Sequence, residues 1–285
     1  MSSTLDVEAP ATDPRDEPPA RHRSSGDVAR TVVRGISQTL ITLGLVALLF
    51  VVYQLWVTDL LAARAQDRLT EQLQDQWAGS PALDTPGATD PTEGTPPADG
   101  SAPPTHTPAP IEAGIGDPFA ILHIPRLGDD YARVVVQGSS EVQLEQGPGH
   151  YVDTAMPGEQ GNFSVAGHRV GRGSPFLDLD RMRPGDAIVV ETADSWFVYR
   201  VLGDPATGEF TGDPTGIPGR EVVRPSQVSV IAPTPGGGEP TGAYLTLTTC
   251  HPRYSAAQRL ILHARLDGAP ISKAAAPDGP AALAG

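Results

Sequence analysis

The residue with the clearest chemical potential is a single cysteine near the end of the chain. Cys250 is the only cysteine in 285 residues, and it closes the strand-like run Thr246-Leu247-Thr248-Thr249-Cys250. Pro252 cannot continue a central strand, because proline has no backbone N–H to donate. Cys250 is therefore predicted to lie at a strand end, where a reagent can reach it and where its thiolate can act as a nucleophile. The alternative is a structural thiol that packs as a small hydrophobe.

A positive charge follows the cysteine at short range. Arg259 opens the next strand-like segment after a loop of about eight residues. If the two strands pair antiparallel, both residues lie near the connecting end of the pair, and the guanidinium approaches the thiol. A cation at that position stabilises a thiolate and also a developing oxyanion.

A general base has to come from one of the seven histidines. His168 follows the strand-like segment 162–166 and precedes a polar loop, so it has the same strand-end placement as the cysteine. His150 lies in a loop after Gly and Pro and stays open as a second candidate, because spacing alone does not prove contact. His251 adjoins Cys250, but neighbouring strand residues point to opposite faces. The remaining histidines are predicted to be cytoplasmic, in a linker or within strands: His22, His106, His123 and His263.

The elements that must carry these residues are short β-strands. Residues 117–267 alternate short apolar runs with Gly and Pro and contain no long amphipathic helix, a pattern typical of an all-β barrel or sandwich. About 150 residues suffice for one core. Residues 268–285, mostly Ala, Pro and Gly, are predicted to be a disordered tail. The predicted strands are 119–124, 133–137, 162–166, 187–191, 195–202, 227–231, 244–249 and 259–266.

One long apolar run in the first half of the chain predicts a membrane anchor. Residues 36–57 carry no charge, and at about 1.5 Å per residue they span a hydrocarbon core of about 30 Å. We place the anchor helix at 31–58, with the lipid bilayer as a partner of 36–57. The arginines before it predict that 1–30, which is disordered in composition, is cytoplasmic and that the rest of the chain is extracellular. A cleaved signal peptide is the alternative, but this apolar run exceeds the usual length of about 7–15 residues.

Residues 59–116 are predicted to join the anchor to the folded domain. Their first part has helical spacing and predicts a short juxtamembrane helix. The rest is a low-complexity linker of Pro, Thr, Gly, Ala and Asp.

The charge balance excludes polyanion binding. The formal net charge is −14, and Lys273 is the only lysine, whereas a nucleic-acid surface needs clustered Lys and Arg. No cysteine pair or close histidine pair has zinc spacing. We therefore expect no nucleic-acid partner, no metal site and no cofactor, with calcium on a carboxylate cluster as the open alternative.

Two segments together resemble the catalytic region of a known enzyme family. Residues 147–186 include Ala-Gly-His-Arg at 166–169, and residues 243–266 include Thr-Leu-Thr-Thr-Cys at 246–250. They resemble the sortases, and among these the class E housekeeping sortases of actinobacteria. Sortases are membrane-anchored cysteine transpeptidases, and the resemblance covers most of residues 117–267.

The resemblance implies an eight-stranded β-barrel with short helical turns and a complete catalytic set. Cys250 would be the nucleophile, His168 the acid and base, and Arg259 the stabiliser of the oxyanion and substrate. The same two segments supply three candidate substrate-binding residues, Thr248, Thr249 and Tyr151.

The resemblance also implies the reaction. The enzyme would cut secreted proteins between Thr and Gly of a C-terminal Leu-Ala-x-Thr-Gly type motif, form a thioester with Cys250, and pass the protein to a peptidoglycan-precursor amine. Two alternatives stay open: a sortase that polymerises pilins, and a catalytically idle, membrane-tethered peptide-binding barrel in which Cys250 is structural. An L,D-transpeptidase finds no support, because no His-Gly-Cys type cluster surrounds Cys250.

Overall fold

The computed structural model describes residues 25–53, 58–79, 106–211 and 213–284. The chain divides into two compact units, Met1–Val52 and Tyr53–Gly285. Residues 1–24 and most of the predicted linker lie outside the described residues.

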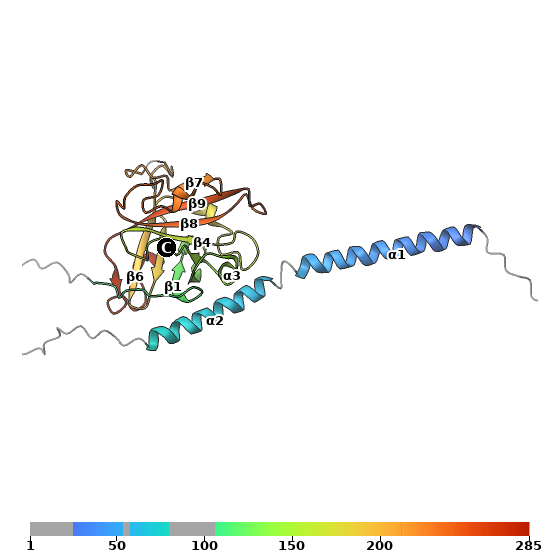
Figure 1. The fold of residues 1–285 in the computed structure, drawn as a ribbon, viewed down its shortest axis with the longest axis horizontal. Helices are drawn as coiled ribbons and strands as arrows, with labels where there is room; N and C mark the ends of the chain where they lie inside the picture. The colour runs from blue at the N-terminus through green and yellow to red at the C-terminus, as the bar shows by residue number, and fades with distance from the viewer. Residues whose placement is uncertain (1–24, 54–57, 80–105, 212, 285) are drawn as a thin grey trace, which may run out of the picture. The chain divides into compact units, whose positions relative to one another are not determined.

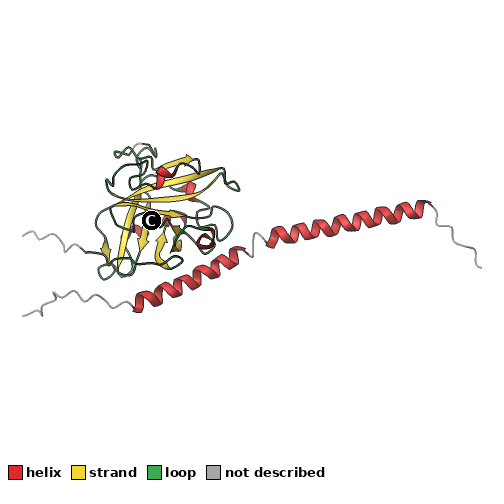
Figure 2. Cartoon of the chain, viewed as in Figure 1, coloured by secondary structure: helices red, strands yellow, loops and turns green. Residues whose placement is uncertain are grey.

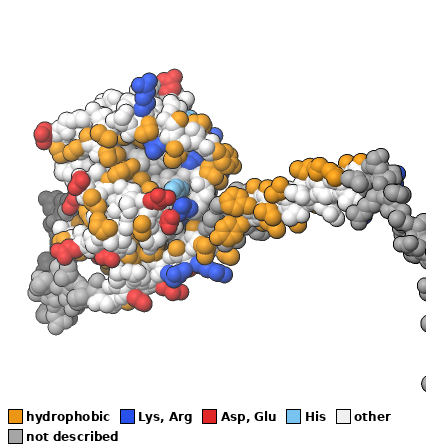
Figure 3. Space-filling view, turned by 45° about the vertical axis from the view of Figure 1, so that its right-hand side comes forward, with side chains coloured by type: hydrophobic (Ala, Val, Ile, Leu, Met, Phe, Trp, Pro, Cys, Tyr) orange, Lys and Arg blue, Asp and Glu red, His pale blue; other side chains and the backbone are white. Residues whose placement is uncertain are grey.

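The first unit contains one helix, α1, at Ser25–Val52. Within it, Ala29–Val52 is long and apolar enough to cross a membrane. Its large apolar side chains are exposed rather than packed in a core, as Figure 3 shows along the helix. The hydroxyls of Ser37, Thr39 and Thr42 donate to carbonyls one turn back, which satisfies the polar side chains of this apolar helix. The helix is compatible with the predicted membrane anchor.

The second unit is built around a closed β-barrel (Figure 1). Eight strands form the ring, and β9 pairs back onto β6 to close it. This arrangement confirms the predicted eight-stranded all-β barrel. In ring order the strands are β6 (Ser195–Val201), β5 (Ala187–Glu191), β1 (Pro118–His123), β2 (Ala132–Gln137), β3 (Gly149–His150), β4 (Gly161–Ala166), β8 (Ala243–His251) and β9 (Gln258–Leu266).

Two further strands extend the barrel: β7 (Arg220–Val223) pairs with β9, and β10 (Ile271–Ser272) pairs with β6. The predicted strand at 227–231 is instead the 3-10 turn η4, although its Val and Ile content favours a strand. Among the described residues of the second unit, helical structure apart from α2 is confined to short turns (Figure 2). These are η2 (Pro125–Leu127), α3 (Glu141–Leu144), η3 (Leu179–Arg181), η4 (Val228–Ile231) and η5 (Ala281–Ala284).

Side-chain alternation decides which residues face the barrel interior. On β8, Leu245 and Leu247 belong to the main hydrophobic core. Because strand residues alternate between faces, Thr246, Thr248 and Cys250 point outward. The same rule applies to the neighbouring strands, whose inward-facing core residues are Phe163 and Val165 on β4 and Leu260 and Leu262 on β9.

Helix α2, Thr58–Gly79, covers the outer side of β1 and β2. Its buried Leu69 and Leu73, with Trp77 beside them, pack against apolar side chains of the two strands. Gln66 adds polar contacts with Val134 of β2: its Oε1 accepts the Val134 N–H at 2.8 Å, and its Nε2 donates to the Val134 carbonyl at 3.3 Å. The helix lies where the sequence predicts a juxtamembrane helix, and it is part of the barrel unit.

The last part of the predicted linker, from His106 onward, is not a free spacer, because it contacts the barrel. The Nε2 atom of His106 lies 2.7 Å from the hydroxyl oxygen of Ser195, and the Ala109 N–H donates to Asp194 at 2.8 Å. Helix α2 and the segment from His106 onward therefore pack on the same barrel. The segment between them connects two parts of one unit.

The predicted disordered tail at 268–285 needs correction. Strand β10 pairs with β6, and Ile271, Ala276 and Leu283 pack against Val189 and Trp196. The Nζ atom of the single lysine lies 2.7 Å from Glu191 and 3.8 Å from the Trp77 ring centroid. The small residues of this tail gave no local sign of order, because its partner surface is assembled from distant strands.

Candidate active site

The three predicted catalytic residues lie at one edge of the barrel. The parallel pairing of β4 with β8 ends at Ala166 and Thr248. His168 and Cys250 each follow two residues later, so the register brings them to the same level at the same sheet edge. Arg259 is the direct cross-strand partner of Cys250 in the antiparallel pairing of β8 with β9.

All three positions also share a face. Cys250 points outward on β8, and its partner Arg259 points outward on β9. His168 continues the outward-facing series of β4. The thiol is free and partly exposed, as the prediction of a strand-end position requires.

The Arg259 side chain currently supports the turn that joins β8 and β9. Its Nη1 donates to the carbonyls of Ala256 and Gln258, each at 3.0 Å. Directly opposed strand residues have Cβ atoms about 4.5–5.5 Å apart. A side-chain rotation therefore suffices to bring the guanidinium to the thiol or to a bound carbonyl.

His168 has the electrostatic features of a reacting group. Its Nε2 is buried and has no hydrogen-bond partner among the described residues. Burial lowers the pKa of His168, the charge of Arg172 lowers it further, and Glu141 and Glu145 act in the opposite direction. This nitrogen is therefore available to exchange a proton with a bound group.

The loop that follows His168 is conformationally unusual. Gly171, Arg172, Gly173 and Ser174 all have positive φ, of 73°, 53°, 76° and 41°. This region is costly for residues other than glycine. Ion pairs with Glu145 and Glu141 hold the Arg172 guanidinium. The strained turn therefore fixes a positive charge near the imidazole.

The second candidate base, His150, is a structural residue. It is fully buried, and its ring packs edge-on against Phe119 and at a tilt against Phe163 of the core. Its Nδ1 lies 2.7 Å from Gln137 Oε1, and its Nε2 lies 2.9 Å from Thr154 Oγ1. Burial lowers the pKa of His150 to about 4. The structure thus separates two histidines that sequence spacing left open.

The candidate substrate-binding residues fall into two groups. Tyr151 and Thr248 are hydrogen-bonded through their hydroxyl oxygens at 3.0 Å, and Thr248 shares the outer face of Cys250. Thr249 points inward, is 2% exposed, and donates its hydroxyl to the Gly167 carbonyl at 2.8 Å. Thr249 therefore holds β8 against the residue that precedes His168, which differs from the predicted substrate contact.

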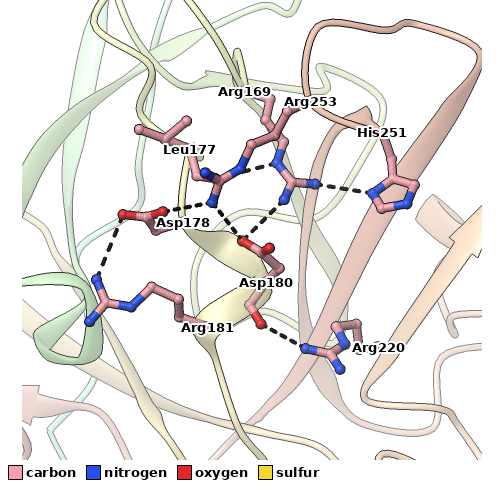
Figure 4. Close-up of polar contacts among 8 residues, drawn as sticks. All are labelled: Arg169, Leu177, Asp178, Asp180, Arg181, Arg220, His251 and Arg253. Carbon is pink, nitrogen blue, oxygen red and sulfur yellow. Dashed lines mark hydrogen bonds and ion pairs between the residues drawn. The ribbon is translucent and has the colours of Figure 1, made fainter.

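Sequence reasoning missed the arginine next to His168. Arg169 is 3% exposed and contacts His251, the residue after Cys250 (Figure 4). The signal was present in the alternation rule, because the residue after an outward-facing histidine must point inward. Among the described residues, no group of three or more His, Cys, Asp or Glu side chains could hold a metal ion.

Comparison with known proteins gives the following matches. The sortase domain family model matches residues 122–267. Sortase SrtE1 of Streptomyces coelicolor is 36% identical over 256 residues, which are 87% of this chain and 60% of that protein. This chain thus spans less than two thirds of that relative. Sortase SrtE2 of the same organism is 34% identical over 255 residues, 86% of this chain and 85% of that protein.

Among solved structures, the SrtF sortase from Corynebacterium diphtheriae has a TM-score of 0.55 and 39% sequence identity. The match covers 62% of this chain and 96% of that chain. Its fold therefore corresponds to the barrel unit described above.

Proposed function

The chain belongs to the sortase family of cysteine transpeptidases, and we propose that it is a class E housekeeping sortase that cleaves a C-terminal sorting motif and joins the protein to an amine. The observation that supports this proposal is the placement of Cys250, His168 and Arg259 on one face at one strand edge. A binding module has no need for a thiol, an imidazole and a guanidinium at the same place.

The proposed reaction has two halves. The Cys250 thiolate attacks the carbonyl carbon before the scissile bond, and Arg259 stabilises the oxyanion of the tetrahedral intermediate. His168 gives its proton to the leaving amine as the C–N bond breaks and a thioester forms. An incoming amine then attacks the thioester, passes a proton to His168, and releases the thiolate as the new amide forms.

The protonation states limit the rate of this reaction. The imidazolium form of His168 has to be present to protonate the leaving amine. Burial lowers the pKa of His168, so its protonated share is smaller. The acid that the first half-reaction needs is therefore scarcer than with an ordinary histidine, and we expect a slow enzyme.

The substrate class follows from the family. Sortases act on proteins with sorting signals, and we propose a Leu-Ala-x-Thr-Gly type motif cut between Thr and Gly. The acceptor is proposed to be an amine of a peptidoglycan precursor, and the substrates secreted proteins. Tyr151 and Thr248, on the outer face beside Cys250, are the proposed peptide contacts.

The proposed location is the cell membrane. Helix α1 supports a single span, and Arg30 and Arg34 at its start favour a cytoplasmic N-terminus. The barrel unit would then lie outside the cell, where it meets secreted substrates and cell-wall precursors.

The test is transpeptidation by the full-length protein in detergent. A quenched Leu-Ala-x-Thr-Gly peptide is supplied with glycine-type or diaminopimelate-type amines, and mass spectrometry follows the thioester and the joined product. Native protein should give both species, and Cys250→Ala should give neither. Peptide binding without any adduct, over a range of pH and amines, would instead identify an idle binding barrel. Joining only to a lysine-bearing protein acceptor would identify a pilin polymerase.

A further inference from the structure

Each of two proposed catalytic residues is followed directly by a residue that points to the other side of the sheet. Arg169 follows His168 and His251 follows Cys250. Both continue the inward-facing series of their strands, β4 and β8. The two side chains meet beneath the catalytic face (Figure 4).

Arg169 uses its planar fork for three contacts. Its Nε donates to the Leu177 carbonyl at 3.3 Å, one terminal nitrogen donates to His251 Nδ1 at 3.1 Å, and the other lies 3.0 Å from Asp180 Oδ1. A buried charge is tolerated only when it is paired and hydrogen-bonded in this way. Lysine has a single terminal nitrogen and cannot reproduce the fork.

The contact defines the state of His251. A guanidinium has donors and no acceptor, so His251 Nδ1 must accept the hydrogen bond. The ring is then neutral, with its proton on Nε2. His251 is thereby assigned one tautomer by its partner.

The contact lies just beyond the last backbone ladder. Pairing of β4 with β8 ends at Ala166 and Thr248, and two hydrogen bonds of Gly167 extend it by one residue. Among the described residues, the next hydrogen bond between the segment after β4 and the end of β8 is the one from Arg169 to His251. That bond lies at the level of the two catalytic side chains, each one residue away.

The Asp180 carboxylate holds the Arg169 guanidinium through an ion pair. It lies in η3 and also contacts Arg253, which follows Pro252 in the turn after β8. Burial alone would raise the pKa of Asp180, but Arg169 and Arg253 outweigh it and lower the pKa. The carboxylate is therefore charged at neutral pH and joins the two arginines.

We propose that Arg169 is a positioning residue for the transpeptidase. Its hydrogen bond to His251 links the segment after β4, which carries His168, to the end of β8, which carries Cys250. This link sets the distance between the imidazole and the thiol. This inference rests on the proposed function of the site. A displacement of about 1 Å can cost about a hundredfold in rate, so a small slackening of this tie is enough to matter.

Four variants of the full-length protein test the tie by activity. Arg169→Met and His251→Leu should each lower kcat at least about tenfold while KM stays within about twofold, because geometry in the transition state is lost and peptide binding is kept. His251→Asn places an acceptor oxygen near the position of Nδ1 and should retain most of kcat. The double variant Arg169→Met with His251→Leu should lose little more than either single variant.

Arg181→Gln is the matched control. Arg181 is an exposed arginine that contacts Asp178 at 3.7 Å at the edge of the same network (Figure 4). Its removal should leave kcat and KM unchanged, and thermal unfolding of every variant identifies loss of fold. Native kcat in folded His251→Leu, or equal losses in His251→Leu and His251→Asn, would overturn the proposal.

A second readout needs no substrate. Histidine nitrogen NMR should find His251 with its proton on Nε2 in the native protein and a mixture of tautomers in Arg169→Met. If native protein shows no transpeptidation, the proposed function fails, and the tie is then judged by this tautomer change and by altered alkylation of Cys250. An unchanged tautomer with unchanged alkylation would refute the tie itself.

Discussion

The proposed catalytic side chains are held by their neighbours in the chain. Thr249 and Gly167, the residues before Cys250 and His168, are joined by a hydrogen bond from the Thr249 hydroxyl to the Gly167 carbonyl. Arg169 and His251, the residues after His168 and Cys250, are joined by a second hydrogen bond. His168 Nε2 has no hydrogen-bond partner in the part of the chain that the structure describes. Thr249 and Arg169 are therefore buried and hydrogen-bonded, whereas the residue proposed to react has a hydrogen-bonding atom available.

The charges beside His168 predict that removing either one shifts the pKa of His168, and that the two shifts have opposite signs. Arg172 lowers the pKa of His168, whereas Glu145 raises it. Arg172→Gln should therefore raise the pKa of His168, and Glu145→Gln should lower it. An NMR titration of the His168 ring measures both, with the native protein as reference. Shifts of the same sign in the two variants would contradict the assigned electrostatics.

At the scale of elements, a parallel strand pair positions the site, and a docked helix covers another part of the barrel. Strands β4 and β8 are parallel neighbours, and this brings the ends of two distant segments together. Helix α2 covers the outer side of β1 and β2. Its apolar side chains form a second hydrophobic cluster with those strands, outside the main core of the barrel.

This view of α2 predicts a stability effect far from the site. Leu73 is fully buried against β1 and β2, and Leu73→Ala should lower the free energy of unfolding by about 2–5 kcal/mol. Leu61→Ala, at a side chain 49% exposed on the same helix, is the matched control and should change it by less than about 0.5 kcal/mol. Urea unfolding compares them. Equal effects would mean that α2 does not stabilise the barrel.

At the scale of the whole molecule, segments before and after the barrel strands in the sequence pack against the barrel. Helix α2 and the C-terminal tail both contact it, and the lysine of the tail lies against Trp77 of α2 and Glu191 of β5. Inside the barrel, the buried His150 joins β3 to the core aromatic rings. The unit therefore depends on a neutral imidazole at its centre.

The buried imidazole predicts how stability changes with pH. The pKa of His150 is about 4 in the folded protein, below the value of about 6.5 expected for the unfolded chain. Between these values the unfolded state binds more protons, so stability falls as pH falls from about 6.5 to about 4. The total is on the order of 3 kcal/mol. Urea unfolding across this range should show a flatter slope for His150→Asn. An unchanged slope would remove His150 as the cause.

Features that depend on local pattern can be predicted from the amino-acid sequence. The uncharged run at 36–57 predicts the membrane-compatible helix, and the short alternating runs predict the β-barrel. Pro252 and the short loop to Arg259 place Cys250 at a strand end beside a cation. Each of these conclusions needs only residue periodicity, punctuation by proline, or contact between segments close in the chain.

Contacts between residues far apart in the sequence follow from the three-dimensional fold. Spacing favours His168 and leaves His150 open as a second candidate, whereas the register of β4 on β8 brings His168 to the level of Cys250 and the core encloses His150. The inward partner of His251 and the ordered tail also depend on contacts between remote segments. Local patterns report the period of a strand, whereas its neighbour and register follow from burial summed over the whole barrel.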